Sequence, residues 1–231
     1  MNVEIVAITA PAGRHIPPIV VTPEDLIVYI ARVSNPENQD NVGTGAKLLR
    51  YCLDHGHVSV FESVSMTVEI ETTRMISAQL LRHRSFTFQE FSQRYASVSD
   101  LCCARAPEAR MQDAKNRQSS LPCEDAAISE WWEDTSANIM DLSRNIYNQA
   151  LEKGIAKEVA RAVLPMATQT RLYMTGNVRS WIHYLGSRLD PTTQLEHRVV
   201  AHEIAQIFLE QFPVVSEAID LRTKMFDSKV G

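Results

Sequence analysis

Residues 63–84 read SVSMTVEIETTRMISAQLLRHR, and the hydrophobic period changes within this stretch. From Val64 to Ile70, apolar residues alternate with polar ones, which is typical of a strand with one buried face. From Thr73 onward, the apolar residues follow a helical spacing instead. The sequence therefore predicts a strand that leads directly into a helix.

The predicted helix carries three polar side chains on one face. Gln79, Arg82 and His83 stand at positions i, i+3 and i+4, which neighbour each other on a helix surface. After this helix, SFTFQ at residues 85–89 alternates again and predicts extended chain. Its two phenylalanines would lie on one side and its Ser, Thr and Gln side chains on the other.

The segment from Arg74 to Arg94 concentrates positive charge in an acidic chain. It holds four arginines and one glutamate, a formal charge of 4 − 1 = +3, whereas the whole chain carries −5. Arginine is a permanently charged, bidentate donor for phosphate, and these arginines lie among aromatic residues. We interpret the segment as part of a site for a planar anion, such as a nucleotide, a flavin or a single-stranded nucleic acid.

The rest of the chain predicts one compact α+β unit over residues 1–231, without internal repeats. Thr22 followed by Pro is a typical helix start, and Asn177 would cap another helix. The polar stretch 104–125 shows no period and is expected to form a functional or mobile loop. The other elements are expected as a strand at 3–9, a strand and turn at 168–177, and helices at about 23–33, 44–54, 124–153, 156–164, 178–189 and 192–212.

Composition and charge disfavour several classes of protein. With 45% hydrophobic and 22% charged residues the chain is an ordinary globular protein, and its pI near 5.8 disfavours a dedicated nucleic-acid binder. No apolar run is long enough to cross a bilayer. The first residues, interrupted by Glu4, predict a strand rather than a signal peptide. The four cysteines lack CxxC spacing, so a reduced, cytoplasmic protein is expected.

Metal binding is not indicated by the histidines. His55 and His57 are two residues apart, and His197 and His202 are five apart. Neither pair has the i, i+4 spacing of a helical zinc site, and the sequence contains no HExxH. We therefore expect no metal.

Reactive cysteines and glycine-rich nucleotide loops are not indicated either. The sequence contains no Walker motif and no GxGxxG. Cys102, Cys103 and Cys123 lie beside the polar loop or at its end, without a neighbouring histidine in sequence that would activate a thiol. The arginine-rich segment stays the strongest indication of a ligand site.

The segment RHRSFTFQEFSQRY at residues 82–95 resembles the signature RHRxxSxNxxSxR of the flavin-dependent thymidylate synthases. Thr87 stands for the Ser of this signature and Gln89 for its Asn, and both keep similar hydrogen-bonding groups. Ser63 stands where the family has a His. Further segments that resemble the family in order and spacing are ARVS at 31–34, HGHVSVFES at 55–63, VARAVLP at 159–165, TGNVRSW at 175–181 and TTQLEHR at 192–198.

The resemblance implies a fold, a reaction and an assembly. The fold would be α+β, an antiparallel sheet with several long helices, in a homotetramer whose active sites lie at subunit interfaces. The reaction would be reductive methylation of dUMP to dTMP, with methylenetetrahydrofolate as one-carbon donor, FAD as cofactor and NADPH as reductant. No protein nucleophile is implied. Nor does the resemblance imply a nucleic-acid or membrane partner.

The same resemblance assigns roles to individual residues. Arg188 is expected to be catalytic, because it would stabilise the negative charge that develops on the uracil ring. The positions that match dUMP contacts are Gln79, Arg82, Glu90, Ser92, Gln93, Arg94, Arg161 and Arg188, and backbone groups at Leu80, Leu81 and Phe91 would join them. The positions that match FAD contacts are Ser34, His57, Ser59, Arg82, His83, Arg84, Glu90, Asn177, Arg179 and His183.

Two other readings stay open from the sequence. One is a module that binds single-stranded nucleic acid through Arg82, Arg84, Phe86, Phe88 and Tyr95, with binding that falls steeply as salt is added. The other is an assembly protein of the same fold without activity. The acidic net charge argues against the first, and the matched arginines argue against the second.

Overall fold

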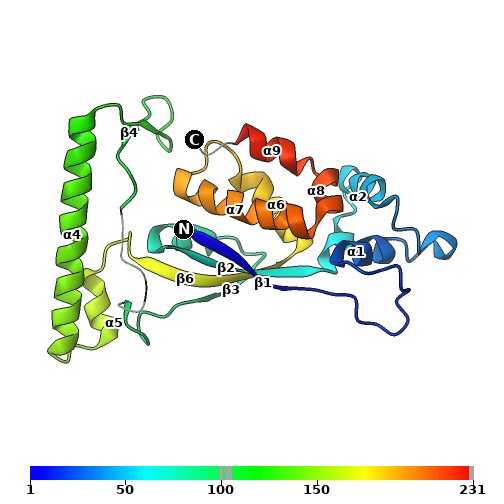
Figure 1. The fold of residues 1–231 in the computed structure, drawn as a ribbon, viewed down its shortest axis with the longest axis horizontal. Helices are drawn as coiled ribbons and strands as arrows, with labels where there is room; N and C mark the ends of the chain where they lie inside the picture. Colours follow the sequence, from blue (N-terminus) through cyan, green and yellow to red (C-terminus); the bar gives the residue numbers. More distant parts are fainter. Residues whose placement is uncertain (99–100, 102–105, 229–231) are drawn as a thin grey trace. The chain divides into compact units, whose positions relative to one another are not determined.

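The structure is a computed structural model that describes residues 1–98, 101 and 106–228 (Figure 1). Its contacts divide the chain into two compact units. Unit 1 comprises residues 1–70, 83–88 and 173–231, and unit 2 comprises residues 71–82 and 89–172. The expected assignment of the whole chain to one domain stays a prediction.

One four-stranded sheet has the strand order β1 (Asn2–Ile8), β2 (Ser65–Thr73), β6 (Gln169–Asn177) and β3 (Thr87–Glu90). Two contacts fix β2 and β6 as antiparallel. The amide of Val178 donates to the carbonyl of Val64, and farther along β2 the hydroxyl of Thr67 bonds that of Thr175 at 2.9 Å. The expected α+β class with an antiparallel sheet is confirmed.

In unit 1, helix α7 (Leu195–Gln211) packs against β1 and against α6 (Val178–Arg188), α8 (Pro213–Ala218) and α9 (Leu221–Asp227) (Figure 1). Its inward residues, such as Phe208, are fully buried, as is Trp181 of α6. The remaining helical segments are α1 (Pro23–Ala31), η1 (Pro36–Asn38), α2 (Gly45–Asp54) and η2 (Val58–Glu62).

The two short helices α8 and α9 were not expected from the sequence. Pro213 suggests only the end of a helix, but it is also the first residue of α8. A proline is tolerated there because the first amides of a helix have no partner within the helix. The next two amides, of Val214 and Val215, donate to the carboxylate of Glu24 at 2.8 and 3.2 Å. A residue of α1 therefore satisfies the start of α8.

In unit 2, the long helix α4 (Ala126–Glu152) packs on α5 (Lys157–Ala160) and η4 (Arg161–Val163). The Oγ of Ser143 donates to the carbonyl of Val163 at 2.6 Å, and the indole of Trp132 donates to the carbonyl of Pro107 at 2.8 Å. The sequence predicts one helix over 156–164, whereas the structure divides it into a single α-turn and a 3₁₀ turn before Pro165.

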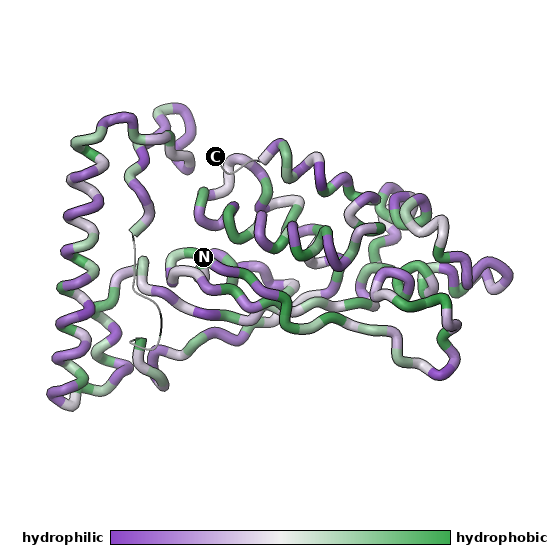
Figure 2. The backbone as a smooth tube through the Cα atoms, in the orientation of Figure 1, coloured by the Kyte–Doolittle hydropathy of each residue, from purple (hydrophilic) through white to green (hydrophobic). Residues whose placement is uncertain are grey.

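A second face of α4 is apolar and exposed. Figure 2 shows hydrophobic and hydrophilic residues interleaved along this helix. Five large side chains spaced three, four or eight residues apart lie on one face and form what we call the α4 stripe. Its members and their exposed fractions are Ile128 at 38%, Trp131 at 61%, Ile139 at 54%, Leu142 at 60% and Ile146 at 44%. Among the described residues, no helix is both long and apolar enough to span a bilayer.

The helix after Thr73 is shorter than the sequence predicts. α3 (Arg74–Leu80) ends before Arg82 and His83, so the expected shared helical face with Gln79 is wrong. The amide of Arg82 closes a turn on Gln79, and the amide of Phe86 closes a second turn on His83. This second turn brings Phe86 into the core of unit 1, where its ring lies 4.6 Å from that of Trp181.

Two other expected loops are regular structure. Residues 175–177 continue β6 instead of turning. Gly176 lets the ring of Phe86 lie directly on this strand, because a Cβ at position 176 would lie only 2.5 Å from Cε1 of Phe86. Within the polar stretch, β4 (Arg110–Gln112) and β5 (Ser120–Pro122) form an antiparallel hairpin. The side-chain Nε2 of Gln112 lies within hydrogen-bond distance of four carbonyls of the connecting loop, and its two N–H groups are shared among them.

Candidate functional site

In unit 1, the arginine that the sequence predicts to be catalytic is bound to a histidine of the arginine-rich motif. The Nε of Arg188, at the end of α6, donates to Nε2 of His83 at 2.9 Å. A guanidinium stays protonated, so His83 must be the acceptor. His83 is therefore neutral, and its proton lies on Nδ1.

Two further aromatic side chains enclose His83. The ring centroid of Tyr184 lies 5.0 Å from that of His83, and the ring centroid of His197 lies 6.2 Å from it. Both rings meet His83 close to edge-on. Both residues are fully buried. Burial, with the nearby Arg188 and His183, lowers the pKa of His83 to about 4. Burial also lowers the pKa of His197 to about 3, with Arg188 and His83 adding to the effect.

Among the described residues, the positive charge of Arg188 has no protein counter-ion. Its neighbours are neutral at pH 7, and burial raises the pKa of Tyr184. In the part of the chain that the structure describes, no carboxylate pairs with Arg188, and its terminal nitrogens have no protein acceptor. The guanidinium is thus anchored through Nε while both terminal amino groups remain for an anionic or carbonyl ligand.

Other predicted FAD contacts in unit 1 have partners within the chain. Asn177 caps α6 by accepting from the amide of Ser180 at 2.9 Å, so it has a structural role whatever it binds. Arg179 forms a salt bridge with Glu62, and the side chains of both residues are partly exposed. Arg84 and His183 are exposed. Arg84, Arg179 and the Nδ1–H of His83 are donors of the kind that bind phosphate groups.

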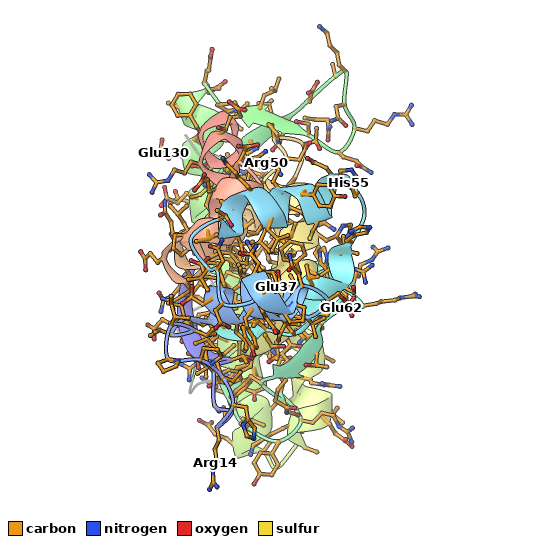
Figure 3. The ribbon with its side chains drawn as sticks, turned by 90° about the vertical axis from the view of Figure 1, so that its right-hand side faces the viewer. Arg14, Glu37, Arg50, His55, Glu62 and Glu130 are labelled. Atoms are coloured by element: carbon orange, nitrogen blue, oxygen red, sulfur yellow. The ribbon has the colours of Figure 1, made fainter. Side chains whose placement is uncertain are left out.

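The remaining predicted FAD contacts of unit 1, Ser34, His57 and Ser59, are all exposed. His57 follows α2, whose last turn carries Tyr51 stacked on His55 with ring centroids 3.9 Å apart. His55, labelled in Figure 3 with Glu62, lies at the surface of the molecule. The HGH segment is therefore an exposed group of rings at a helix end.

Unit 2 contains the predicted dUMP residues other than Arg188. Glu90, at the end of β3, has a side chain that is only 15% exposed, and it pairs with Arg74 of α3 at 2.5 Å. Its Oε1 also accepts from Ser77 at 2.5 Å and from Thr170 at 3.0 Å. These three partners lie outside the signature, and the sequence did not identify them.

Three predicted dUMP residues of unit 2 are exposed arginines: Arg82 and Arg94 of the signature, and Arg161. Arg94 pairs with Glu158 at 3.1 Å, both largely exposed, so the pair is readily exchanged for another anion. Arg82, Ser92 and Arg161 are exposed, and Gln79 is partly buried. Gln93 is only 8% exposed. The predicted backbone contacts have their amides in use at Leu81 and Phe91, which donate to Ser77 and Arg171; Leu80 is buried in α3.

The predicted site residues thus fall into two groups, one in each unit.

The structure corrects one sequence interpretation: Phe86 is 6% exposed and packs on Trp181, so it is a core residue and not a ring on which a ligand can stack. This removes one of the aromatic residues on which the nucleic-acid module depended. Tyr95 is 86% exposed. Cys102 and Cys103 lie outside the described residues; Cys123 is free and partly buried.

Fold and site together define an α+β protein whose arginines, in two groups, leave guanidinium nitrogens for an anionic ligand. Comparison with known proteins gives the family. Residues 19–214 match the model of the family described as thymidylate synthase complementing protein. The chain belongs to this family, the flavin-dependent thymidylate synthases, which are methyltransferases.

Individual relatives support this assignment over most of the chain. A flavin-dependent thymidylate synthase of a Synechocystis species is 51% identical over 200 residues, which cover 87% of this chain and 91% of that protein. A probable flavin-dependent thymidylate synthase of Paramecium bursaria Chlorella virus 1 is 47% identical over 220 residues, covering 95% and 99%. A solved UMP/dUMP methylase of Streptomyces cacaoi, bound with 5-Br dUMP, is 27% identical with a TM-score of 0.78, covering 95% and 94%.

Proposed function

We propose that the chain converts dUMP to dTMP by reductive methylation, with methylenetetrahydrofolate as one-carbon donor and NADPH as reductant. The observation that carries the proposal is the state of Arg188. It is bonded through Nε to neutral His83 and faces no protein carboxylate among the described residues. A fixed cation of this kind, in a site poor in water, stabilises negative charge that develops on N3 and the adjacent carbonyl of the uracil ring.

FAD is proposed as the resident cofactor, and when bound it supplies the hydride chemistry. The chain's own residues would bind and orient it through the donors Arg84, Arg179 and the Nδ1–H of His83, which together suit a pyrophosphate. The other residues in this role are Ser34, His57, Ser59, Arg82, Glu90, Asn177 and His183.

The dUMP phosphate is proposed to bind the exposed arginines of unit 2. Arg82, Arg94 and Arg161 are the candidates, because a guanidinium fork fits a phosphate better than a point charge does. Arg94 would exchange its exposed partner Glu158 for the phosphate. The other residues proposed to contact dUMP are Gln79, Leu80, Leu81, Glu90, Phe91, Ser92 and Gln93. Arg188 is proposed to contact its uracil ring.

A homotetramer with active sites at subunit interfaces is part of the same proposal, as is a cytoplasmic location. The α4 stripe supports the assembly. Five large apolar side chains on one face of a 27-residue helix are an unusual surface for a monomer. Packing this face on that of a second copy would cover it.

The test of the reaction is tritium release from C5-labelled dUMP. Protein stripped of flavin is incubated with FAD, methylenetetrahydrofolate and NADPH, and each is then omitted in turn. We expect tritium in water and dTMP only with the complete mixture. Turnover without added flavin, or none in the complete mixture with the folded protein, would contradict the proposed function.

A further inference from the structure

A single oxygen of Glu90 has three partners in unit 2. Oε1 forms a salt bridge with NH1 of Arg74 at 2.5 Å and accepts hydrogen bonds from the hydroxyl of Ser77 at 2.5 Å and from that of Thr170 at 3.0 Å. Arg74 and Ser77 come from the same face of α3, three residues apart, and Thr170 comes from β6. Within residues 1–98, 101 and 106–228, the other oxygen, Oε2, has no protein partner.

This arrangement answers an electrostatic difficulty in the proposed site. Glu90 has a side chain only 15% exposed, and the sequence places it among residues that would bind a nucleotide anion. A largely buried carboxylate without a counter-ion is costly, and it would repel a phosphate bound nearby. Arg74 cancels the charge of Glu90, while the two hydroxyls fix the orientation of its carboxylate group.

We propose that Arg74 is a positioning residue of the nucleotide site. It neutralises the charge of Glu90 and, with Ser77 and Thr170, fixes the position of Oε1. The other oxygen, Oε2, is then oriented to accept a hydrogen bond from a sugar hydroxyl of the bound nucleotide. A carboxylate oxygen is an acceptor only, and hydroxyl groups of sugars are a common partner for it. This inference rests on the proposed function, in which Glu90 contacts dUMP.

A purely structural ion pair is the competing explanation for Arg74. Its side chain is 38% exposed, and a pair at that exposure could serve only to hold α3 against β3. The two explanations differ in what happens when the charge of Glu90 is also removed. If Arg74 acts by neutralising Glu90, a neutral amide at position 90 makes Arg74 dispensable for binding.

The experiment is a double-mutant cycle on dUMP binding to the FAD-loaded protein, measured by calorimetry. We expect Arg74→Met to weaken dUMP binding at least tenfold and Arg74→Lys to recover much of the loss, because Lys keeps the charge. In the Glu90→Gln background, Arg74→Met should change the Kd by less than twofold. In turnover assays, Arg74→Met should raise the KM for dUMP more than it lowers kcat.

Arg171→Met is the matched control. Arg171 pairs with Glu71 at 2.6 Å in the same unit, and neither residue belongs to the proposed site. We expect less than a twofold change in dUMP binding. The inference is overturned if Arg74→Met binds dUMP like the wild type, or if the effects of Arg74→Met and Glu90→Gln simply multiply. Wild-type protein that does not bind dUMP would overturn the proposed function as well, so the two failures are distinguishable.

Discussion

The Nε of Arg188 and the Nε2 of His83 are joined by a hydrogen bond of 2.9 Å in which the arginine donates. The two residues are separated by 105 positions in the chain, and neither could be paired with the other from sequence alone. The bond fixes three properties at once: the tautomer of His83, the orientation of the guanidinium, and the availability of its two terminal nitrogens.

The first prediction concerns Arg188. Replacing it by Ala should lower the rate of dTMP formation by about 10²- to 10³-fold, because a preorganised donor to developing charge is lost. FAD should stay bound, since the proposed pyrophosphate donors are other residues. Turnover is measured by tritium release and flavin content by absorbance. Near-normal turnover, or loss of flavin together with activity, would contradict the assigned role.

The second prediction concerns acid stability and His197. Its pKa in the folded state is lowered from 6.5 to about 3, so the folded protein resists protonation there. The contribution of His197 is complete above the unfolded value of 6.5 and is lost as the pH falls towards 3. Replacing it by Leu should therefore reduce the loss of unfolding free energy between pH 7.5 and pH 5 by about 1–2 kcal/mol.

Urea unfolding at both pH values measures this difference. Comparing the variant with the wild type cancels the pH-dependent contributions of other groups to the unfolding free energy. One of these is Glu24, whose pKa is raised by burial to about 7, so that its contribution grows as the pH falls. His15→Leu, a change at an exposed histidine, provides the control for replacing a histidine by leucine. An equal pH dependence in His197→Leu would mean that His197 is not held neutral by burial.

Local sequence patterns predicted most of the secondary structure for identifiable reasons. The alternation from Val64 to Ile70 reports one buried face of β2, and the Thr22-Pro pair marks the start of α1, where Thr22 and Asp25 form a reciprocal cap. The end of α3 was predicted wrongly because it depends on the burial of Phe86 against Trp181, a contact 95 residues away in sequence. Local propensity contains no information of that kind.

The residues of the candidate site were likewise only partly predictable from the sequence. The signature identified Arg82, His83, Arg84 and Arg94, because their spacing is a motif. It could not identify the donors to Glu90, since Thr170 reaches it from a strand that is 80 residues away. Two weaker signals were available. Ser77 stands three residues after Arg74 on one helix face, and Tyr184 stands four residues before Arg188.

The third prediction tests the contact that ends the helix early. Gly176→Ala should destabilise unit 1 by about 1–3 kcal/mol, because the added methyl group overlaps the ring of Phe86 and the core must shift. A second change, Phe86→Leu, makes room and should recover part of the loss in the double variant. Chemical denaturation of the four proteins of this cycle measures the coupling. Additive effects would show that the two side chains do not compete for the same space.

The last prediction concerns the α4 stripe and the proposed homotetramer. Changing both Trp131 and Leu142 to Glu places charge in the middle of this apolar face and should lower the molar mass in solution, because an unpaired charge cannot be buried between two copies. The helix itself should persist, since both side chains are exposed within one chain.

Light scattering on a sizing column measures the mass, and circular dichroism checks that α4 is intact. Ala137→Glu is the matched control, because Ala137 is exposed on the opposite, polar side of the same helix. It should leave the mass unchanged. If the double variant keeps the wild-type mass while the wild type is a tetramer, the α4 stripe is not a subunit contact. If the wild type is itself a monomer, the proposed assembly is wrong, and the site must be complete within one chain.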